Sequence, residues 1–174
     1  MAEQIKPKNV ILIGFMGTGK SSIGKLLAQK LKWNFVDTDS LIGKSAGMTI
    51  SEIFTKKGEP KFRDMESDIL QQVLSKENQV ISTGGGIVLR EENMNRMKQN
   101  GIIIALSATP EIIFARTRHR KTRPVLGDEP TLDRVKEILN FRSSLYAQAD
   151  FSINTSALSK DKIITLILDF LKTL

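Results

Sequence analysis

The chain has 174 residues, 40% of them hydrophobic and 26% charged, which is typical of one folded domain and excludes a disordered or membrane-embedded chain. The longest apolar runs, such as residues 102–106, are far shorter than the ~20 residues that cross a bilayer, and the N-terminus lacks an apolar signal region, so we expect a cytoplasmic protein. Lys and Arg number 26 against 19 Asp and Glu, a net charge of +7 that predicts anionic ligands, and the absence of cysteine excludes disulfides and thiolate metal sites.

Short runs rich in β-branched residues alternate with segments of helical length. The runs span residues 10–15, 34–37, 80–83, 102–107 and 151–155. This alternation predicts a parallel sheet covered by helices, with residues 1–174 forming a single domain. The helix after the first run and the last helix each show an apolar face, which we predict to be core: Ile23, Leu26, Leu27 and Leu31, then Ile163, Ile167, Phe170, Leu171 and Leu174.

A phosphate-binding loop follows the first run. Residues 14–21, GFMGTGKS, match G-x-x-x-x-G-K-[ST] between an apolar run and an amphipathic helix. In such a loop the backbone N–H groups surround the phosphates, Lys20 reaches the β- and γ-phosphates, and Ser21 ligates Mg²⁺. The alternative is a glycine-rich turn with an incidental lysine. The motif does not separate a kinase from a GTPase switch, an ATPase motor or a nucleotide sensor. The predicted ATP-binding residues here are Gly17, Thr18, Gly19, Lys20, Ser21 and Ser22.

Two carboxylates, Asp37 and Asp39, follow the second run. In extended backbone, residues two apart project to the same side, so both would face the crevice beyond the strand ends. One could serve Mg²⁺ while the other takes or orients the proton of an acceptor hydroxyl. The alternative is that Asp39 only caps a helix that begins at Ser40.

The next segment starts a helix at Thr49, where Glu52 completes a capping box, and then places Arg63 three residues before Glu66. That spacing suits an ion pair that would fix the Arg63 guanidinium. The alternative is an ion pair on the surface in contact with water, which is the usual case. The third run leads into Gly84-Gly85-Gly86, where a ligand can approach the backbone closely, although a flexible turn is the simpler interpretation.

The last segments carry cations. Residues 116–130 begin with Arg116, Arg118, Arg120, Lys121 and Arg123 and continue into Gly and Pro, which predicts a mobile loop with few apolar anchors, while a nucleic-acid-binding arm is the competing interpretation. Farther on, Arg142 falls on the apolar stripe of a helix from Leu132, so its guanidinium either reaches solvent or meets an anion.

Several separated motifs together resemble the shikimate kinase family. They are GFMGTGKS, DTD at 37–39, FRDME at 62–66, GGG at 84–86, RP at 123–124 and RSSLY at 142–146. The resemblance runs from residue 10 to about residue 156. It implies a three-layer α/β/α P-loop kinase fold with a five-stranded parallel sheet in the order 2-3-1-4-5 and a mobile lid at about 116–130. It also implies transfer of the ATP γ-phosphoryl group to the 3-hydroxyl of shikimate, with Mg²⁺ as cofactor.

The resemblance also assigns site residues. Lys20, Asp39 and Arg123 would be catalytic, Ser21 and Asp37 would serve the metal, and Arg116 would lie near adenine. Many P-loop NTPases end the third strand with an acidic residue and this chain does not, which leaves Asp37 as the second metal contact. Helices at about 39–66 would hold shikimate, and the substrate-binding residues would be Asp39, Phe54, Phe62, Arg63, Gly84, Gly85, Gly86 and Arg142, with Glu66 holding Arg63.

Two rival functions remain at this point. Another hydroxy-acid kinase, such as a gluconate kinase, would keep the phosphate loop but need not keep Asp39, Arg63 and Arg142 together. A non-catalytic nucleotide-binding regulator would bind ATP without turnover. We expect a monomer whose partners are the small molecules ATP and shikimate, with no nucleic acid and no membrane.

Overall fold

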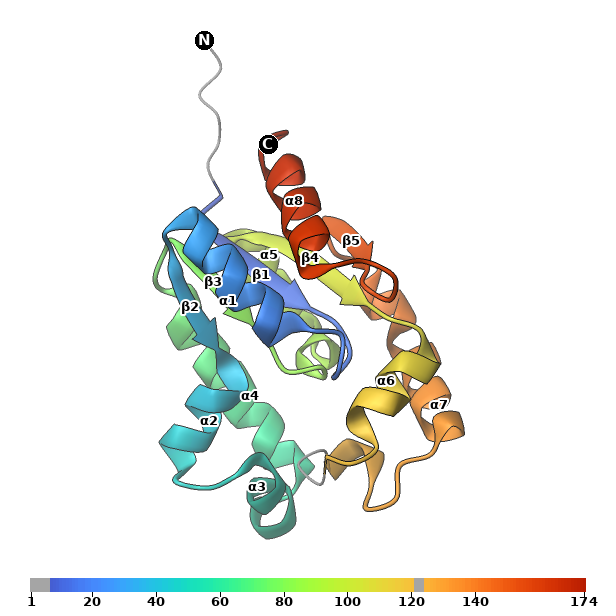
Figure 1. Ribbon diagram of the computed structural model, residues 1–174. Coiled ribbons are helices and arrows are strands. Elements are labelled where there is room, and N and C mark those ends of the chain that lie inside the picture. The colour runs from blue at the N-terminus through green and yellow to red at the C-terminus, as the bar shows by residue number, and fades with distance from the viewer. Residues whose placement is uncertain (1–6, 121–123) are drawn as a thin grey trace.

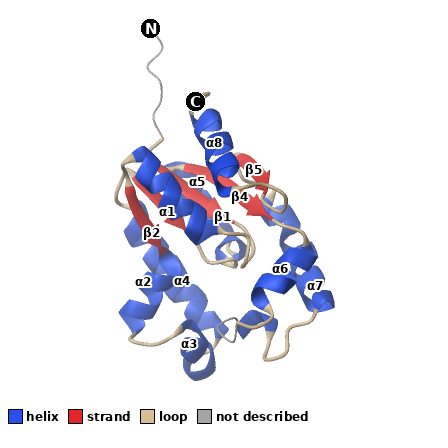
Figure 2. Ribbon diagram, viewed as in Figure 1, coloured by secondary structure: helices blue, strands red, loops and turns tan. Residues whose placement is uncertain are grey.

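The computed structural model describes residues 7–120 and 124–174, and Figures 1 and 2 show an alternation of helices and strands along the chain. The first half contains β1 (Asn9–Ile13), α1 (Lys20–Leu31), β2 (Asn34–Asp37), α2 (Thr38–Ala46), α3 (Ile50–Lys57), α4 (Glu59–Leu74) and β3 (Gln79–Ser82). The second half contains η1 (Ile87–Leu89), α5 (Glu91–Asn100), β4 (Ile102–Ser107), α6 (Pro110–Thr117), η2 (Pro124–Leu126), α7 (Leu132–Tyr146), β5 (Phe151–Asn154) and α8 (Lys160–Leu171).

Within the described ranges the strands form one parallel sheet in the order β2-β3-β1-β4-β5, which confirms the predicted order. The central strand β1 pairs with β3 through Leu12 and Ser82, and with β4 through Leu12 and Ile104. Because the strands are parallel, their carboxyl ends meet at one edge of the sheet. The loops that follow β1, β2 and β3 are therefore brought together beyond that edge.

The two faces of the sheet bury different sets of apolar residues. Val10 and Leu12 of β1 pack with α1 and α8, whereas Ile11 and Ile13 point to the other face, which α4 and α5 cover. This alternation follows from the period of two along a strand. The predicted core faces of α1 and α8 are confirmed except at Leu174, which lies beyond the end of α8 and is 39% exposed.

Capping side chains set the starts of several helices, and one of them starts α2 earlier than predicted. The predicted capping box of Thr49 and Glu52 is present, and Thr109 caps α6 as expected. At the end of β2, however, Asp37 is the N-cap: its Oδ1 accepts a hydrogen bond from the backbone N–H of Ser40, and α2 begins at Thr38. The expected extended backbone through Asp39 was therefore wrong, because the cap at Asp37 starts the helix at Thr38, two residues before Ser40.

The cationic segment is more ordered at its two ends than predicted. Helix α6 continues through Arg116 to Thr117, and residues 124–126 form the single turn η2. Leu126 is 4% exposed and packs in a cluster with Phe15 and Met16 of the phosphate loop, so the segment has an apolar anchor that its composition did not reveal. In the described part of the chain no helix is long and apolar enough to span a membrane.

Candidate functional site

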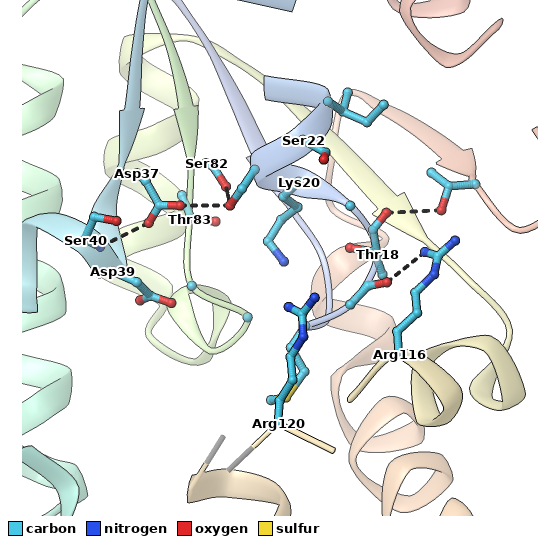
Figure 3. A pocket seen from close by; sticks show the side chains of 18 of the residues that line it. Thr18, Lys20, Ser22, Asp37, Asp39, Ser40, Ser82, Thr83, Arg116 and Arg120 are labelled. Atoms are coloured by element: carbon cyan, nitrogen blue, oxygen red, sulfur yellow. Dashed lines mark hydrogen bonds between the residues drawn. The ribbon is translucent and has the colours of Figure 1, made fainter. Parts of the chain in front are cut away.

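A cavity of about 750 Å³ opens beyond the carboxyl ends of β1, β2 and β3. The phosphate loop, the start of α2, the loop after β3 and the end of α6 line it, as Figure 3 shows from close by. A smaller pocket adjoins it and shares Met16, Asp39, Ile50, Gly84 and Gly85 with the large one. The two spaces therefore meet at Asp39 and the glycine loop, an arrangement that suits two ligands placed end to end.

The phosphate loop is built to receive an anion in the large cavity. Gly17 has φ 80° and Gly19 has φ 97°, conformations that favour glycine, and no side chain caps the N-terminus of α1. Backbone N–H groups at an uncapped helix start are natural partners for phosphate oxygens. Lys20 is 8% exposed, and its Nζ donates to the carbonyls of Gly14 and Phe15 at 2.7 and 2.9 Å. The backbone of the loop thus holds the ammonium group against the cavity wall (Figure 3).

Oxygen ligands suitable for a magnesium ion lie beside this loop. Ser21 Oγ donates to Asp37 Oδ2 at 2.8 Å and lies 3.4 Å from Ser82 Oγ at the end of β3. Among the described residues there is no group of three or more His, Cys, Asp or Glu side chains that could hold a metal ion by themselves. One hydroxyl and one carboxylate fit a magnesium ion that takes its remaining ligands from phosphates and water.

Asp39 lies where the two spaces meet, although it reaches that place from a helix rather than a strand. It belongs to the first turn of α2, and an imagined Cβ on Gly84 would lie 2.7 Å from its Oδ1. The alternative that Asp39 merely caps a helix is wrong, because Asp37 is the cap. Asp39 therefore lines both spaces without serving as the helix cap.

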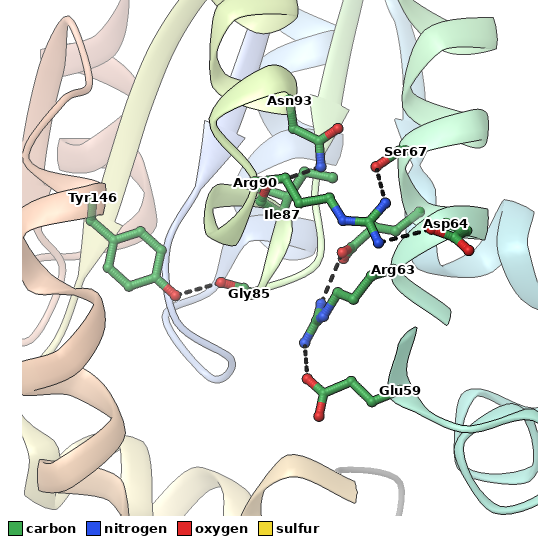
Figure 4. A network of polar contacts seen from close by, with 10 residues as sticks. Glu59, Arg63, Asp64, Ser67, Gly85, Ile87, Arg90, Asn93 and Tyr146 are labelled. Carbon is green, nitrogen blue, oxygen red and sulfur yellow. Dashed lines mark hydrogen bonds and ion pairs between the residues drawn. The ribbon is translucent and has the colours of Figure 1, made fainter. Parts of the chain in front are cut away.

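Arg63 and Glu66 form a buried pair in the small pocket. Arg63 Nη1 donates to Glu66 Oε2 at 2.8 Å, and the two residues are 7% and 1% exposed, so the surface-pair alternative is wrong. Burial raises the pKa of Glu66, although Arg63 acts against it. Burial alone would lower the pKa of Arg63, but the carboxylates of Glu66 and Glu59 outweigh it and raise that pKa. The predicted holding of Arg63 by Glu66 matches this geometry (Figure 4).

Arg142 comes to the same pocket from α7. It is 4% exposed, its guanidinium carbon lies 5.8 Å from the centre of the Phe15 ring, and its buried Nε has no hydrogen-bond partner. The guanidinium therefore does not reach solvent, so that alternative is wrong, and an anion as its partner stays a prediction. One turn later, Tyr146 donates its hydroxyl to the carbonyl of Gly85 at 2.6 Å and so ties α7 to the glycine loop (Figure 4).

Two aromatic rings close the small pocket. Phe54 of α3 and Phe62 of α4 have ring centres 4.7 Å apart and are tilted by 45°. The Arg63 guanidinium lies 5.2 Å from the centre of the Phe62 ring. The pocket thus combines two guanidinium groups and the carboxylates of Asp39 and Glu66 with an apolar wall, a composition that suits a ring carrying both a carboxylate and hydroxyls.

The three glycines make room for protein side chains as well as for a ligand. A Cβ on Gly84 would lie 2.8 Å from Glu66 Oε1, and one on Gly86 would lie 2.2 Å from Arg63 Nη1. The flexible-turn interpretation is therefore incomplete, because the close approach of two charged side chains requires glycine at both positions.

Three further cationic side chains that the structure describes, two from the cationic segment and one from α8, line the large cavity. Arg116 Nη1 donates to the carbonyl of Gly17 at 2.9 Å and lines the large cavity. Arg120, which was given no role from the sequence, lines the same cavity. Lys160 at the start of α8 also lines the cavity and was missed, because the sequence around it forms no recognisable motif. Arg123, predicted to be catalytic, lies outside the described residues.

The chain matches known proteins over nearly its full length. A family model described as shikimate kinase matches residues 16–172. A shikimate kinase of Thermodesulfovibrio yellowstonii is 50% identical over 156 residues, 90% of each chain, and one of Pelotomaculum thermopropionicum is 43% identical over 165 residues, 95% of this chain and 96% of the relative.

Solved structures agree with the sequence matches. The shikimate kinase of Acinetobacter baumannii in complex with shikimate has a TM-score of 0.92 at 34% identity, covering 95% of this chain and 93% of that one. A gluconokinase of Sinorhizobium meliloti has a TM-score of 0.62 at 16% identity, covering 97% and 93%, which shows a shared fold only. On the family match and on relatives of this similarity, the chain belongs to the shikimate kinase family.

Proposed function

We propose that this chain transfers the γ-phosphoryl group of ATP to the 3-hydroxyl of shikimate, giving shikimate 3-phosphate and ADP. The observation that carries the proposal is the small pocket, in which Arg63 and Arg142 are both buried and Asp39 lies at the boundary with the phosphate-loop cavity. Glu66 offsets one of the two buried guanidinium charges, and a carboxylate on an apolar ring would offset the other.

The acceptor would be held at its carboxylate end. Arg63 and Arg142 would donate to that carboxylate, each charge-assisted hydrogen bond contributing roughly 1.5 to 3 kcal/mol. Phe54 and Phe62 would contact the apolar part of the ring. With the carboxylate fixed, the hydroxyls at the opposite side of the ring would reach Asp39 and the backbone of Gly84.

The nucleotide would be held by the phosphate loop. Backbone N–H groups of residues 17–22 would surround the phosphates, Arg116 would contact the base side, and Lys20 would leave the carbonyls of Gly14 and Phe15 for the β- and γ-phosphates. Ser21 and Asp37 would hold Mg²⁺, which supplies charge neutralisation between the β- and γ-phosphates when it is bound.

Asp39 would accept or orient the proton of the acceptor's 3-hydroxyl as its oxygen attacks phosphorus. The bond from the γ-phosphorus to the bridging oxygen breaks as the new bond forms, and ADP leaves with the electron pair. Catalysis then consists of positioning and of electrostatic stabilisation by Lys20 and the loop. Arg123 would stabilise the same transition-state charge, a role that rests on the family resemblance alone.

A screen of acceptors tests the proposed function. Formation of ADP is followed with a coupled assay in the presence of ATP and Mg²⁺, with shikimate or gluconate as acceptor. We expect turnover with shikimate and at least about 10²-fold lower kcat/KM with gluconate, whose open chain cannot fill the aromatic pocket while its carboxylate meets both arginines. Equal use of the two acceptors would contradict the assignment, and binding of ATP without any acceptor-dependent turnover would favour a regulator.

The glycine loop yields a further prediction. Gly86→Ala should raise the KM for shikimate roughly 10- to 100-fold, the loss expected for one charge-assisted hydrogen bond. The reason is that the new Cβ would lie 2.2 Å from Arg63 Nη1 and 2.5 Å from its Cζ, so the guanidinium has to move. The KM for ATP should stay unchanged. Steady-state kinetics with each substrate varied in turn measures the difference.

Gly85→Ala is the matched control, because its Cβ would make ordinary contacts of 3.4 Å or longer. We expect a much smaller rise in the KM for shikimate. If both variants behave alike, flexibility of the loop rather than the position of Arg63 is what the substitutions disturb.

A further inference from the structure

The guanidinium of Arg63 has two acidic partners within the protein. Its Nη1 donates to Glu66 at 2.8 Å and its Nη2 donates to Glu59 at 3.1 Å. Figure 4 shows Arg63 pointing toward Glu59. Gly86 lies against the group so closely that a Cβ there would overlap it. Glu66 was expected from its spacing to Arg63, whereas Glu59, four residues before Arg63 and one turn away on α4, was not.

The two partners differ in how firmly they are held. The Glu66 side chain is 1% exposed, whereas the Glu59 side chain is 53% exposed at the first residue of α4. Separating a buried pair leaves an uncompensated charge, but a half-exposed carboxylate can turn into water at small cost. Glu66 is therefore the fixed partner of Arg63 and Glu59 the exchangeable one.

An incoming carboxylate needs a donor that the exchangeable partner occupies. The two-donor edges of a guanidinium are the pair of Nη atoms and one Nη with Nε. Nη1 is engaged by the buried Glu66, and the buried Nε of Arg63 has no partner. A bidentate ligand that leaves the Glu66 pair intact therefore uses Nη2, where Glu59 binds.

We propose that Glu59 is a positioning residue, which binds Nη2 of Arg63 while the small pocket holds no acceptor. The carboxylate of the incoming acceptor then displaces Glu59 from Nη2. This inference rests on the proposed function. Glu59 is not needed to orient Arg63, because Glu66 holds Nη1 and Gly86 backs the guanidinium. Its presence instead lowers the affinity for every anion that uses Nη2, so that weakly binding anions are kept out while an acceptor that also engages Arg142 still binds.

The experiment compares the wild-type chain with Glu59→Gln, which keeps the shape of the side chain and removes its charge. We expect the Kd for shikimate, measured by titration calorimetry without nucleotide, to fall about 2- to 5-fold, the scale of an exposed ion pair. The KM for shikimate should fall with it, while the KM for ATP stays constant. The Kd for the uncharged methyl ester of shikimate should not fall, because the ester brings no anion to Nη2.

Asp64→Asn is the matched control. It removes the same charge one residue from Arg63, but the Asp64 carboxylate pairs with Arg90 at 2.8 Å. Its Kd for shikimate should equal that of the wild-type chain. An equal gain in both variants would show a general charge effect and would overturn the proposal.

Two further outcomes would contradict the proposed competition between Glu59 and the acceptor's carboxylate. Weaker binding of shikimate by Glu59→Gln would mean that Glu59 holds Arg63 in the bound state, and an unchanged Kd would mean that it does not compete. In both cases turnover of shikimate by the wild-type chain leaves the proposed function standing. Absence of shikimate binding and turnover in the wild-type chain would instead reject the proposed function itself.

Discussion

Replacing Lys20 with Met should lower kcat at least about 10²-fold while the chain stays folded. The Lys20 ammonium lines the large cavity, and in the proposed function it exchanges the two backbone carbonyls that it contacts for the β- and γ-phosphates. Loss of one preorganised charge aimed at the transition state typically costs ~10² to 10³ in kcat. Met has nearly the same stem length, so the packing around the loop should be maintained. Turnover at saturating ATP and thermal unfolding together measure the effect.

Lys160→Met is the control for this substitution. Lys160 lines the same cavity, but its Nζ contacts Ser22 Oγ at 3.3 Å at the start of α8. We expect its loss to change the KM for ATP by a small factor and to leave kcat near the wild-type value. A folded Lys20→Met variant with normal kcat would remove Lys20 from the mechanism, and an equal loss in both variants would mean that the total charge of the cavity is what matters.

The fold could be predicted from the sequence because local patterns and overall topology agree. Alternating apolar runs and amphipathic helices indicate a covered parallel sheet, and the capping box at Thr49 locates the start of α3. The order of the strands came from the family resemblance, since periodicity alone does not give it. The structure of the cationic segment was harder to predict, because the burial of Leu126 depends on contacts with Phe15 and Met16, more than 100 residues earlier in the chain.

The site was predictable where a motif fixes the backbone and less so where packing positions the side chains. The spacing of Arg63 and Glu66 indicated a pair, but its burial depends on the glycine loop and on residues distant in the chain that line the same pocket. Arg120 and Lys160 reach the cavity from separate elements, so no local pattern marks them. The turn at Asp37 shows the same limit: whether an aspartate continues a strand or caps a helix depends on the hydrogen bond it accepts.

Asp39→Asn should lower kcat by roughly 10² to 10⁴, the usual contribution of a general base, and should change the affinity for ATP little. The amide keeps the size of the side chain but cannot accept the proton of the acceptor hydroxyl. Asp39 lies where the small pocket meets the large cavity, so an acceptor hydroxyl held there would face both the Asp39 carboxylate and the γ-phosphate. Single-turnover measurements at saturating shikimate separate this effect on the chemical step from effects on binding.

Asp37→Asn provides the comparison, because the two aspartates are two residues apart and make different contacts. Asp37 accepts hydrogen bonds from Ser21 Oγ and from the backbone of Ser40, on the metal side of the cavity. We expect its substitution to raise the Mg²⁺ concentration needed for half-maximal activity, a dependence that Asp39→Asn should leave unchanged.

If Asp39→Asn instead keeps a normal kcat and only raises the KM for shikimate, Asp39 binds the acceptor without taking its proton. The proton would then leave through the phosphoryl group itself or through water, and catalysis would rest on Lys20 and the loop.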